Sequence, residues 1–201
     1  MIIDAHIHLG CEEELRVAHE AWALATALFT GGRKLTFDEQ RRALRKPADI
    51  VREMDAAGID KGIVMPTPMA GVNVHVVNDT MAAAVKEFPD RLAGLGTVDP
   101  HLGAGAVGEV HRCAELGLKG LKFHPPGQAF YPNDPNVYPV YAACMQLGMP
   151  ILVHTGTTWL GYTKIKYAKP ELLDDVACDF RDLKIIMTHW SQPWWEENMS
   201  V

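Results

Sequence analysis

The residues of this chain best suited to chemistry are histidines that stand at the ends of short apolar runs. Imidazole nitrogens are ligands that zinc, iron and manganese all accept. On an extended strand, side chains two residues apart lie on the same face, so a His-x-His pair can reach a single ion. The five histidines placed in this way are His6, His8, His124, His154 and His189.

The pair His6 and His8 is weak evidence when taken alone, because two histidines near the mouth of a sheet can simply be held there by hydrogen bonds. Two further apolar runs lead into His154 and His189, so three separate strands would each end in histidine. That combination favours a metal site. Asp4 has the same parity as the pair, so we expect it on the same face, either as a partner for a metal-bound imidazole or as an ordinary strand carboxylate.

Six apolar runs rich in branched residues recur along the chain, and each is typical of a buried strand. Helical stretches with clear starts and stops lie between them, such as the one from Pro47 to Gly58. After the first run the units repeat about every 30 residues, the length of a strand and its crossover helix. This alternation predicts a parallel sheet. The predicted strands are Ile2–His6, Gly62–Met65, Leu92–Val98, Leu118–Phe123, Ile151–Val153 and Leu183–Met187.

A TIM-type (β/α)8 barrel is the α/β fold in which these histidines would meet, because the C-terminal ends of its strands converge on one face. One spacing is irregular, since residues 11–46 separate the first two predicted strands. They contain a helical stretch around Ala18 to Leu28 and a polar segment. An insertion at this place lies on the active face, so we expect it to form a lid or rim of the site, or a dimer contact.

The composition narrows the possible partners. The chain has 201 residues, 48% of them hydrophobic, and a formal net charge of -6, which predicts one domain and argues against a nucleic-acid partner. No apolar run is long enough to span a membrane, and no signal peptide is recognisable at the N-terminus. The four cysteines form no C-x-x-C pair. We therefore expect a cytoplasmic protein, a small-molecule substrate and a homo-oligomer, most simply a dimer.

Lys122 and His124 share the parity of Gly120 on the fourth predicted strand, so both are candidates to face the barrel interior. Lys122 could pair with a substrate carboxylate or, if carbamylated, bridge two metal ions. The alternative is a lysine that reaches outward. His124 could contact substrate or metal, and the alternative is a histidine whose hydrogen bonds are satisfied by the turn at Pro125 and Pro126.

Four aromatic residues lie in segments that would surround the mouth of the barrel. Phe130 and Tyr131 belong to a loop rich in glycine and proline, Trp159 follows the fifth predicted strand, and Trp190 follows the sixth. Aromatic loops above a metal site often form the substrate pocket, which makes these residues candidates for substrate binding. For Phe130 and Tyr131 the alternative is packing of the loop against the barrel.

Three segments of the chain carry a family resemblance. They read IIDAHIHLG at 2–10, GLKFHPPGQAFYPNDPNVYPVYAACMQLGMPILVHTG at 120–156 and DLKIIMTHWSQPWWEE at 182–197. In this order they resemble the amidohydrolase-2 branch of the amidohydrolase superfamily. That branch includes aminocarboxymuconate semialdehyde decarboxylase and resorcylate decarboxylases.

The resemblance implies a ligand set and a cofactor. In the superfamily two histidines of strand one, one of strand five and one of strand six surround a divalent metal. The matching residues here are His6, His8, His154 and His189. Zinc is the first expectation for the ion, and manganese or iron is the alternative. His154, His189 and Lys122 are the candidates for a catalytic role.

The chain departs from the family pattern at its C-terminal end. Members of the superfamily close the barrel with eight strands, and an aspartate after strand eight holds the metal or its water and transfers protons. Only six strands are predicted here, so strands seven and eight and this aspartate are missing from residues 1–201. An open six-stranded sheet exposes two apolar edges. We therefore expect a single barrel domain that is incomplete at its C-terminus or completed by another chain.

Three functions fit these residues. The first expectation is a metal-dependent hydrolase that uses a metal-activated water on a small carbonyl compound such as an ester, amide or acyl thioester. The alternative is a metal-dependent decarboxylase of an aromatic or dienoic acid, in which the ion orients a carboxylate. The third is a truncated barrel that binds metal without turnover. The ligand set does not distinguish the two reactions.

Overall fold

The computed structural model describes all residues from Met1 to Val201. Six parallel strands follow one another in sequence order, in two groups of three. A bridge between Gly96 and Leu121 joins the groups, and the backbone N–H of Gly96 donates to the carbonyl oxygen of Gly120. The strands are β1 (Ile3–His8), β2 (Lys61–Met65), β3 (Leu92–Gly94), β4 (Leu121–Phe123), β5 (Ile151–His154) and β6 (Ile185–Thr188).

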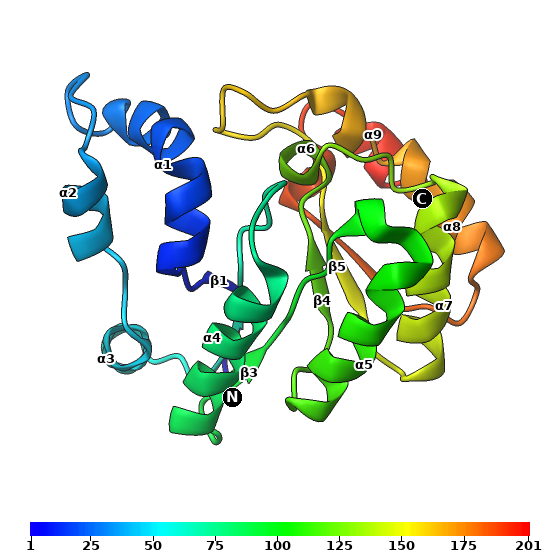
Figure 1. Cartoon of the computed structure of the whole chain (residues 1–201), viewed down its shortest axis with the longest axis horizontal. Helices are drawn as coiled ribbons and strands as arrows, with labels where there is room; N and C mark the ends of the chain where they lie inside the picture. Colours follow the sequence, from blue (N-terminus) through cyan, green and yellow to red (C-terminus); the bar gives the residue numbers. More distant parts are fainter.

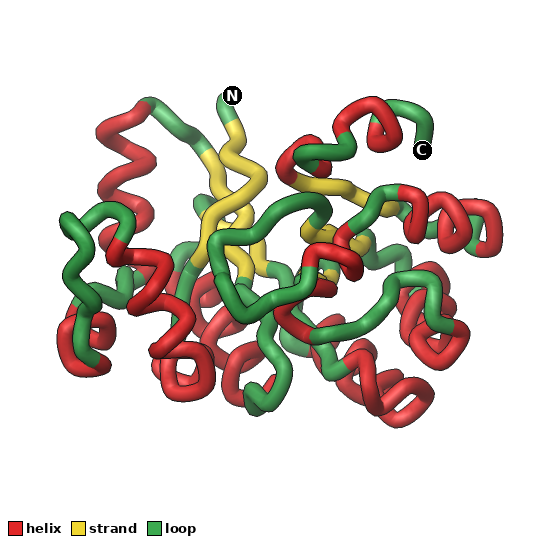
Figure 2. Tube along the Cα trace, turned by 90° about the horizontal axis from the view of Figure 1, so that it is seen from above, coloured by secondary structure: helices red, strands yellow, loops and turns green.

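Helices lie around the outside of the curved sheet, as Figures 1 and 2 show from two directions. Short 3-10 turns join several of them: η1 (Pro100–Ala106), η2 (Pro135–Val137), η3 (Ile165–Ala168) and η4 (His189–Ser191). This is the arrangement of six successive units of a TIM-type (β/α)8 barrel, and the predicted fold is confirmed. The helices are α1 (Glu12–Ala27), α2 (Phe37–Arg42), α3 (Pro47–Ala57), α4 (Val74–Glu87), α5 (Val107–Glu115), α6 (Pro125–Gln128), α7 (Tyr138–Gln146), α8 (Glu171–Asp179) and α9 (Trp195–Asn198).

Helix boundaries follow the local sequence signals. Pro47 occupies the first turn of α3, where its missing N–H is not needed, and Gly58 ends the helix in the left-handed conformation with φ 70°. The third predicted strand was too long, because β3 stops at Gly94. Beyond Gly94, the side-chain amide of Asn78 donates to the carbonyl oxygen of Thr97 and accepts from its backbone N–H, each at 2.8 Å. The backbone of Thr97 is therefore paired with a side chain and not with a neighbouring strand.

The main core, a cluster of 28 buried apolar residues, fills the space between the sheet and the helices. At Gly96 the sheet lies so close to α5 that a Cβ atom would come within 2.6 Å of the Sγ atom of Cys113. Strands β1 and β6 each have a neighbour on one side only. Ile3 and Ile186 on these edge strands are 48% and 47% exposed. No helix is both long and apolar enough to cross a membrane.

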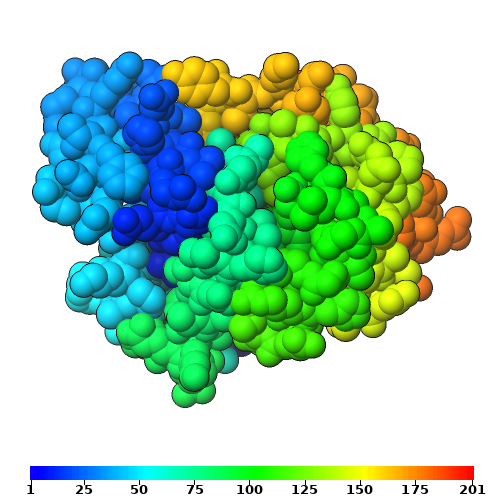
Figure 3. All heavy atoms as spheres, in the orientation of Figure 1, coloured from blue at the N-terminus to red at the C-terminus, as the bar shows by residue number.

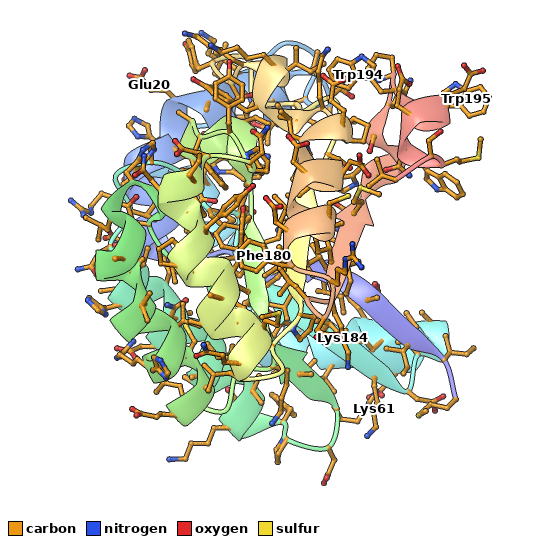
Figure 4. All side chains as sticks on the ribbon, turned by 90° about the vertical axis from the view of Figure 1, so that its right-hand side faces the viewer. Glu20, Lys61, Phe180, Lys184, Trp194 and Trp195 are labelled. Atoms are coloured by element: carbon orange, nitrogen blue, oxygen red, sulfur yellow. The ribbon has the colours of Figure 1, made fainter.

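The two ends of the strands lie on opposite faces of the molecule. Lys61 at the start of β2 and Lys184 just before β6 mark the N-terminal face, at the bottom of Figure 4. Trp194, which follows β6, lies at the opposite end in the same view. The C-terminal ends of the strands, with their histidines, therefore belong to the upper face in that view.

The segment 11–46 forms α1 and α2 and lies beside the C-terminal face. Ala21 and Ala25 of α1 pack against Leu160 from the loop after β5, and the rings of Phe29 and Trp159 lie 5.0 Å apart between centroids. In Figure 3 the blue surface of α1 meets the yellow and orange surface of this loop. The insertion thus borders the strand ends from one side.

Candidate active site at the strand ends

The five histidines expected at strand ends come together on the C-terminal face. The Nε2 atoms of His6 and His8 lie 3.0 Å apart. The ring centroids of His6 and His189 are separated by 4.8 Å, and those of His189 and His154 by 4.7 Å. The ring of His124 lies 4.4 Å from that of His154. Residues from the first, fourth, fifth and sixth units therefore share one cluster of imidazoles.

A bulge in β1 decides which side chains of that strand reach the cluster. Pairing with β2 is regular up to Asp4 and resumes at Ile7, with one extra residue of β1 between them. Because this extra residue breaks the alternation, the pairing register places Asp4 and His8 on opposite faces. The Asp4 carboxylate accepts a hydrogen bond from the backbone N–H of His6 at 3.0 Å. The expectation that Asp4 shares the face of His8 was wrong.

His189 reaches the cluster from a left-handed turn directly after β6. His189, Trp190 and Ser191 have φ values of 68°, 53° and 51°, a conformation that costs an L-residue about 1–2 kcal/mol. The turn is held from below, because the buried Ser191 hydroxyl lies 2.7 Å from that of Thr155. The backbone N–H of Trp194 also donates to the Ser191 carbonyl oxygen at 2.7 Å. Backbone strain of this kind is characteristic of functional sites.

The imidazoles border a cavity of about 710 Å³ that opens on the C-terminal face. Its walls combine the strand-end residues with the loop after β5 and with α1. No aspartate or glutamate lines it. The lining residues are His6, His8, Trp22, Thr67, Lys122, His124, His154, Thr157, Thr158, Trp159, Leu160, His189 and Gln192.

Lys122 extends into this cavity from β4 and does not reach outward. Its side chain is 1% exposed and its Nζ atom has no hydrogen-bond partner. Burial lowers the pKa of Lys122 to about 7, because the ammonium loses its water and gains no counter-charge. His124 is also buried, and its Nδ1 atom has no partner, so the turn at Pro125 and Pro126 does not satisfy it.

Burial keeps the imidazoles neutral. It is the largest cause that lowers the pKa of His6 to about 4 and those of His8 and His154 to about 3, and the nearby charge of Lys122 adds to it. The pKa values of His124 and His189 are lowered for the same reason. A metal ion binds the neutral form of histidine, so the cluster is in the state that a ligand needs.

The donor set fits a divalent metal ion in its chemistry. The Nε2 atoms of His6 and His8 face each other at 3.0 Å, so both imidazoles present a nitrogen to the same space. In the observed side-chain conformations, no group of three or more His, Cys, Asp or Glu residues has the arrangement needed to hold a metal ion. The Nε2 atom of His154 faces the carbonyl oxygen of Thr157 at 3.2 Å. The observed fit is thus one of residue type, burial and protonation.

Thr67 was missed in the sequence and has a direct contact with the cluster. Its Oγ1 atom lies 2.9 Å from Nδ1 of His8. The backbone N–H of Thr67 in turn donates to the buried Glu14 carboxylate at 2.6 Å. The signal was available, because Thr67 follows β2 just as the histidines follow their own strands. Trp22, Thr157, Thr158, Leu160 and Gln192 also line the cavity and were not expected there.

The aromatic candidates divide into two groups. Trp159 lines the cavity. Phe130 is buried against Phe123, with ring centroids 5.8 Å apart, and Tyr131 packs against Tyr167 at 4.7 Å. Neither of them lines the histidine cavity.

Trp190 also lies outside the histidine cavity and is 72% exposed. The structure therefore brings Trp159 to the site and leaves three of the four aromatic candidates outside it.

Known structures share this fold. A variant of 5-carboxyvanillate decarboxylase from Novosphingobium aromaticivorans, solved with manganese and 3-methoxy-4-hydroxy-5-nitrobenzoic acid, superposes with a TM-score of 0.76 at 21% identity. The match covers 98% of this chain and 68% of that one. An uncharacterized TIM-barrel protein from Bordetella bronchiseptica gives a TM-score of 0.73 at 25% identity, over 99% of this chain and 70% of that one.

Sequence comparison gives the family. A decarboxylase of 2-amino-3-carboxymuconate-6-semialdehyde from Dictyostelium discoideum is 32% identical over 79 residues, which are 39% of this chain and 22% of that protein. The chain thus matches about a fifth of this relative. A family model described as amidohydrolase matches residues 3–201. With the ordered histidine motifs and six barrel units already described, this match shows that the chain belongs to the amidohydrolase family, in its amidohydrolase-2 branch.

Proposed function

We propose that this chain forms the active face of a metal-dependent decarboxylase that acts on an aromatic or dienoic acid. The observation that carries the proposal is a cavity lined by five imidazoles and an unpaired lysine, with no carboxylate. Burial disfavours the charge of Lys122, and an anionic substrate would restore it. The site is therefore complementary to a carboxylate.

The relatives favour carbon–carbon cleavage over hydrolysis. Hydrolysis was the first expectation from the sequence, although the ligand set fits both reactions. The semialdehyde enzyme and the 5-carboxyvanillate enzyme are both decarboxylases, and the second was solved with manganese. We accordingly propose manganese as the ion, with zinc as the alternative. His6, His8, His154 and His189 would hold it. When bound, such an ion orients the substrate oxygens and stabilises the negative charge that develops during cleavage.

The residues of the chain then have distinct tasks. Lys122 of β4 pairs with the substrate carboxylate. His124, directly after β4, contacts the substrate beside the ring of His154. The bond between carbon and the carboxylate breaks, carbon dioxide leaves, and the electron pair that remains on carbon accepts a proton from the Lys122 ammonium, which becomes a neutral amine. Trp159 and Trp22 line the cavity and would pack against the apolar part of the substrate.

The test uses the purified chain loaded with Mn²⁺ or Zn²⁺ and incubated with 5-carboxyvanillate and 2,6-dihydroxybenzoate in water enriched in ¹⁸O. We expect about one ion per chain, release of carbon dioxide and a product without ¹⁸O. Incorporation of ¹⁸O into a cleaved ester or amide, without release of carbon dioxide from any acid, would instead show a hydrolase.

A pair of histidine variants serves as a matched control. His154→Ala should lose both the metal and the product, whereas His75→Ala, on the outer helix α4, should lose neither. Equal metal content in the two variants would contradict the assigned ligand set.

A further inference from the structure

A second pocket, of about 220 Å³, opens beside the histidine cavity, and we call it the side pocket. His8, Trp22 and Thr67 line both spaces, so the two are adjacent. The side pocket lies between α1, α2 and the segment that follows β1. The sequence predicted no substrate-binding role for any of its residues. Only His8 was a candidate, as a metal ligand.

The walls of the side pocket are held in place without a ligand. The amide nitrogen of Gln40 in α2 donates to the carbonyl oxygens of His19 and Leu35, at 3.1 and 2.9 Å. Arg41 also lies 3.7 Å from the Glu12 carboxylate across the two helices. These contacts fix α2 to α1. A preformed pocket binds more tightly than one that must be ordered by its ligand.

Most polar groups around the side pocket already have partners, and the exception is the buried Oε1 atom of Gln40, which has none. Both oxygens of the buried Glu14 carboxylate accept backbone N–H groups, from Cys11 at 3.0 Å and Thr67 at 2.6 Å. The Thr26 hydroxyl donates to the Trp22 carbonyl oxygen at 2.8 Å. The groups left to meet a ligand are mainly carbon atoms, of Leu15, Trp22, Leu35, Ala43 and Leu44. A ligand of matching chemistry is therefore mainly apolar, with at most one donor to meet the Gln40 Oε1 atom.

The volume sets the size of that ligand. An apolar cavity of about 150 Å³ in another protein suffices for benzene, so the side pocket has room for a substituted ring or a branched alkyl group. We infer that the side pocket holds the apolar substituent of the substrate whose carboxylate lies beside Lys122, and so selects acids with such a substituent. This inference rests on the proposed function for the identity of the carboxylate, whereas the pocket itself can be tested without turnover.

The experiment measures toluene binding to the metal-free chain by calorimetry and by ligand-observed NMR. Ala43→Trp places a ring at the mouth of the side pocket, and we expect it to weaken toluene binding at least tenfold. Arg42→Trp is the matched control, because Arg42 is the exposed residue directly before Ala43 and lines neither space. Toluene that fails to bind the unmodified chain, or binds Ala43→Trp equally well, would overturn the inference.

A second variant guards against misfolding of the first. Leu35→Ala enlarges the side pocket, and we expect it to raise the affinity for 1-methylnaphthalene relative to toluene at least threefold. An unchanged ratio would count against the pocket. If toluene binding responds to these variants but the chain has no decarboxylase activity, only the proposed function is refuted. A different result would refute only the role of the side pocket. In that case the unmodified chain decarboxylates its substrates, but the KM values for acids with and without an apolar substituent are the same in Ala43→Trp as in the unmodified chain.

Discussion

The imidazole of His8 and the hydroxyl of Thr67 meet at 2.9 Å, between Nδ1 and Oγ1, while the opposite ring nitrogen of His8 faces His6. A partner on the second nitrogen fixes the orientation and tautomer of a ligating histidine. Thr67 is itself held by the buried Glu14. The ring of His8 is thus oriented by a chain of contacts that begins in α1.

Loss of the Thr67 hydroxyl should weaken metal binding. We expect Thr67→Val to lower the affinity for Mn²⁺ or Zn²⁺ by about 10- to 100-fold, as is usual for such partners, and Thr67→Ser to retain most of it. Titration of each variant with the metal ion in a calorimeter measures both affinities. Thr80→Val, on the exposed side of α4, is the control for the loss of a threonine hydroxyl. Equal affinities for Thr67→Val and Thr80→Val would show that Thr67 does not orient His8.

Replacement of Lys122 should separate stability from function. Lys122→Met removes a buried ammonium without a partner, so we expect the free energy of unfolding of the metal-free chain to rise by about 1–3 kcal/mol. Binding of a benzoate inhibitor to the metal-loaded chain should fall more than tenfold. Denaturant unfolding and calorimetry measure the two effects. Lys119→Met, at an exposed position of the same segment, should change neither. A less stable Lys122→Met chain with full benzoate binding would contradict both expectations.

Glu14 should give the chain a distinctive dependence of stability on pH. Burial raises the pKa of Glu14 from 4.5 to about 7. In the unfolded chain the carboxyl loses its proton near pH 4.5, so between pH 4.5 and 7 the folded state binds more protons and stability falls as pH rises. The loss from this group amounts to about 3 kcal/mol.

The measurement compares unfolding free energies of the unmodified chain and Glu14→Gln from pH 5 to pH 8. The advantage of the unmodified chain over the variant should shrink by most of that amount across the range. Buried histidines contribute an opposite slope, but they do so in both proteins and cancel in the difference. A difference that is constant with pH would mean that Glu14 titrates normally.

Two exposed tryptophans of the C-terminal face, Trp159 and Trp190, should respond differently to substitution. Trp159 lines the cavity, so Trp159→Ala should weaken benzoate binding several-fold. Trp190 lies outside it with φ 53°, where glycine relieves the backbone, so Trp190→Gly should leave binding unchanged and stability within about 1 kcal/mol of the original or above it. Calorimetry and thermal unfolding provide the readouts. Weaker benzoate binding in Trp190→Gly would place Trp190 in the substrate site after all.

The order of strands and the gathering of histidines could be predicted because both depend on short-range patterns. Branched apolar runs define the strands, and the barrel geometry then brings His124, His154 and His189 to one face. The face of Asp4 could not be predicted, since it depends on a one-residue bulge that no local signal marks. The same holds for the short β3, whose end is set by Asn78 in another element.

The aromatic lining of the cavity was harder to predict than the gathering of the histidines. Phe130 and Tyr131 follow a strand end, as Trp159 does, yet their rings turn to Phe123 and Tyr167 and away from the cavity. Which way a loop side chain turns depends on tertiary packing that sequence spacing does not encode. The insertion is a similar case, because only the folded chain shows that Trp22 of α1 borders the cavity.

The turn that carries His189 also has a consequence for chirality. Three successive L-residues there adopt the backbone angles that D-residues prefer. A D-amino acid at position 190 would therefore suit this backbone better than the natural enantiomer. Cys178 is exposed and precedes β6 by a few residues, so chemical ligation at that thiol could join a synthetic segment 178–201 to the rest of the chain. A D-residue at position 190 would stabilise the turn that carries the His189 imidazole, and it would leave every side chain that lines the cavity unchanged.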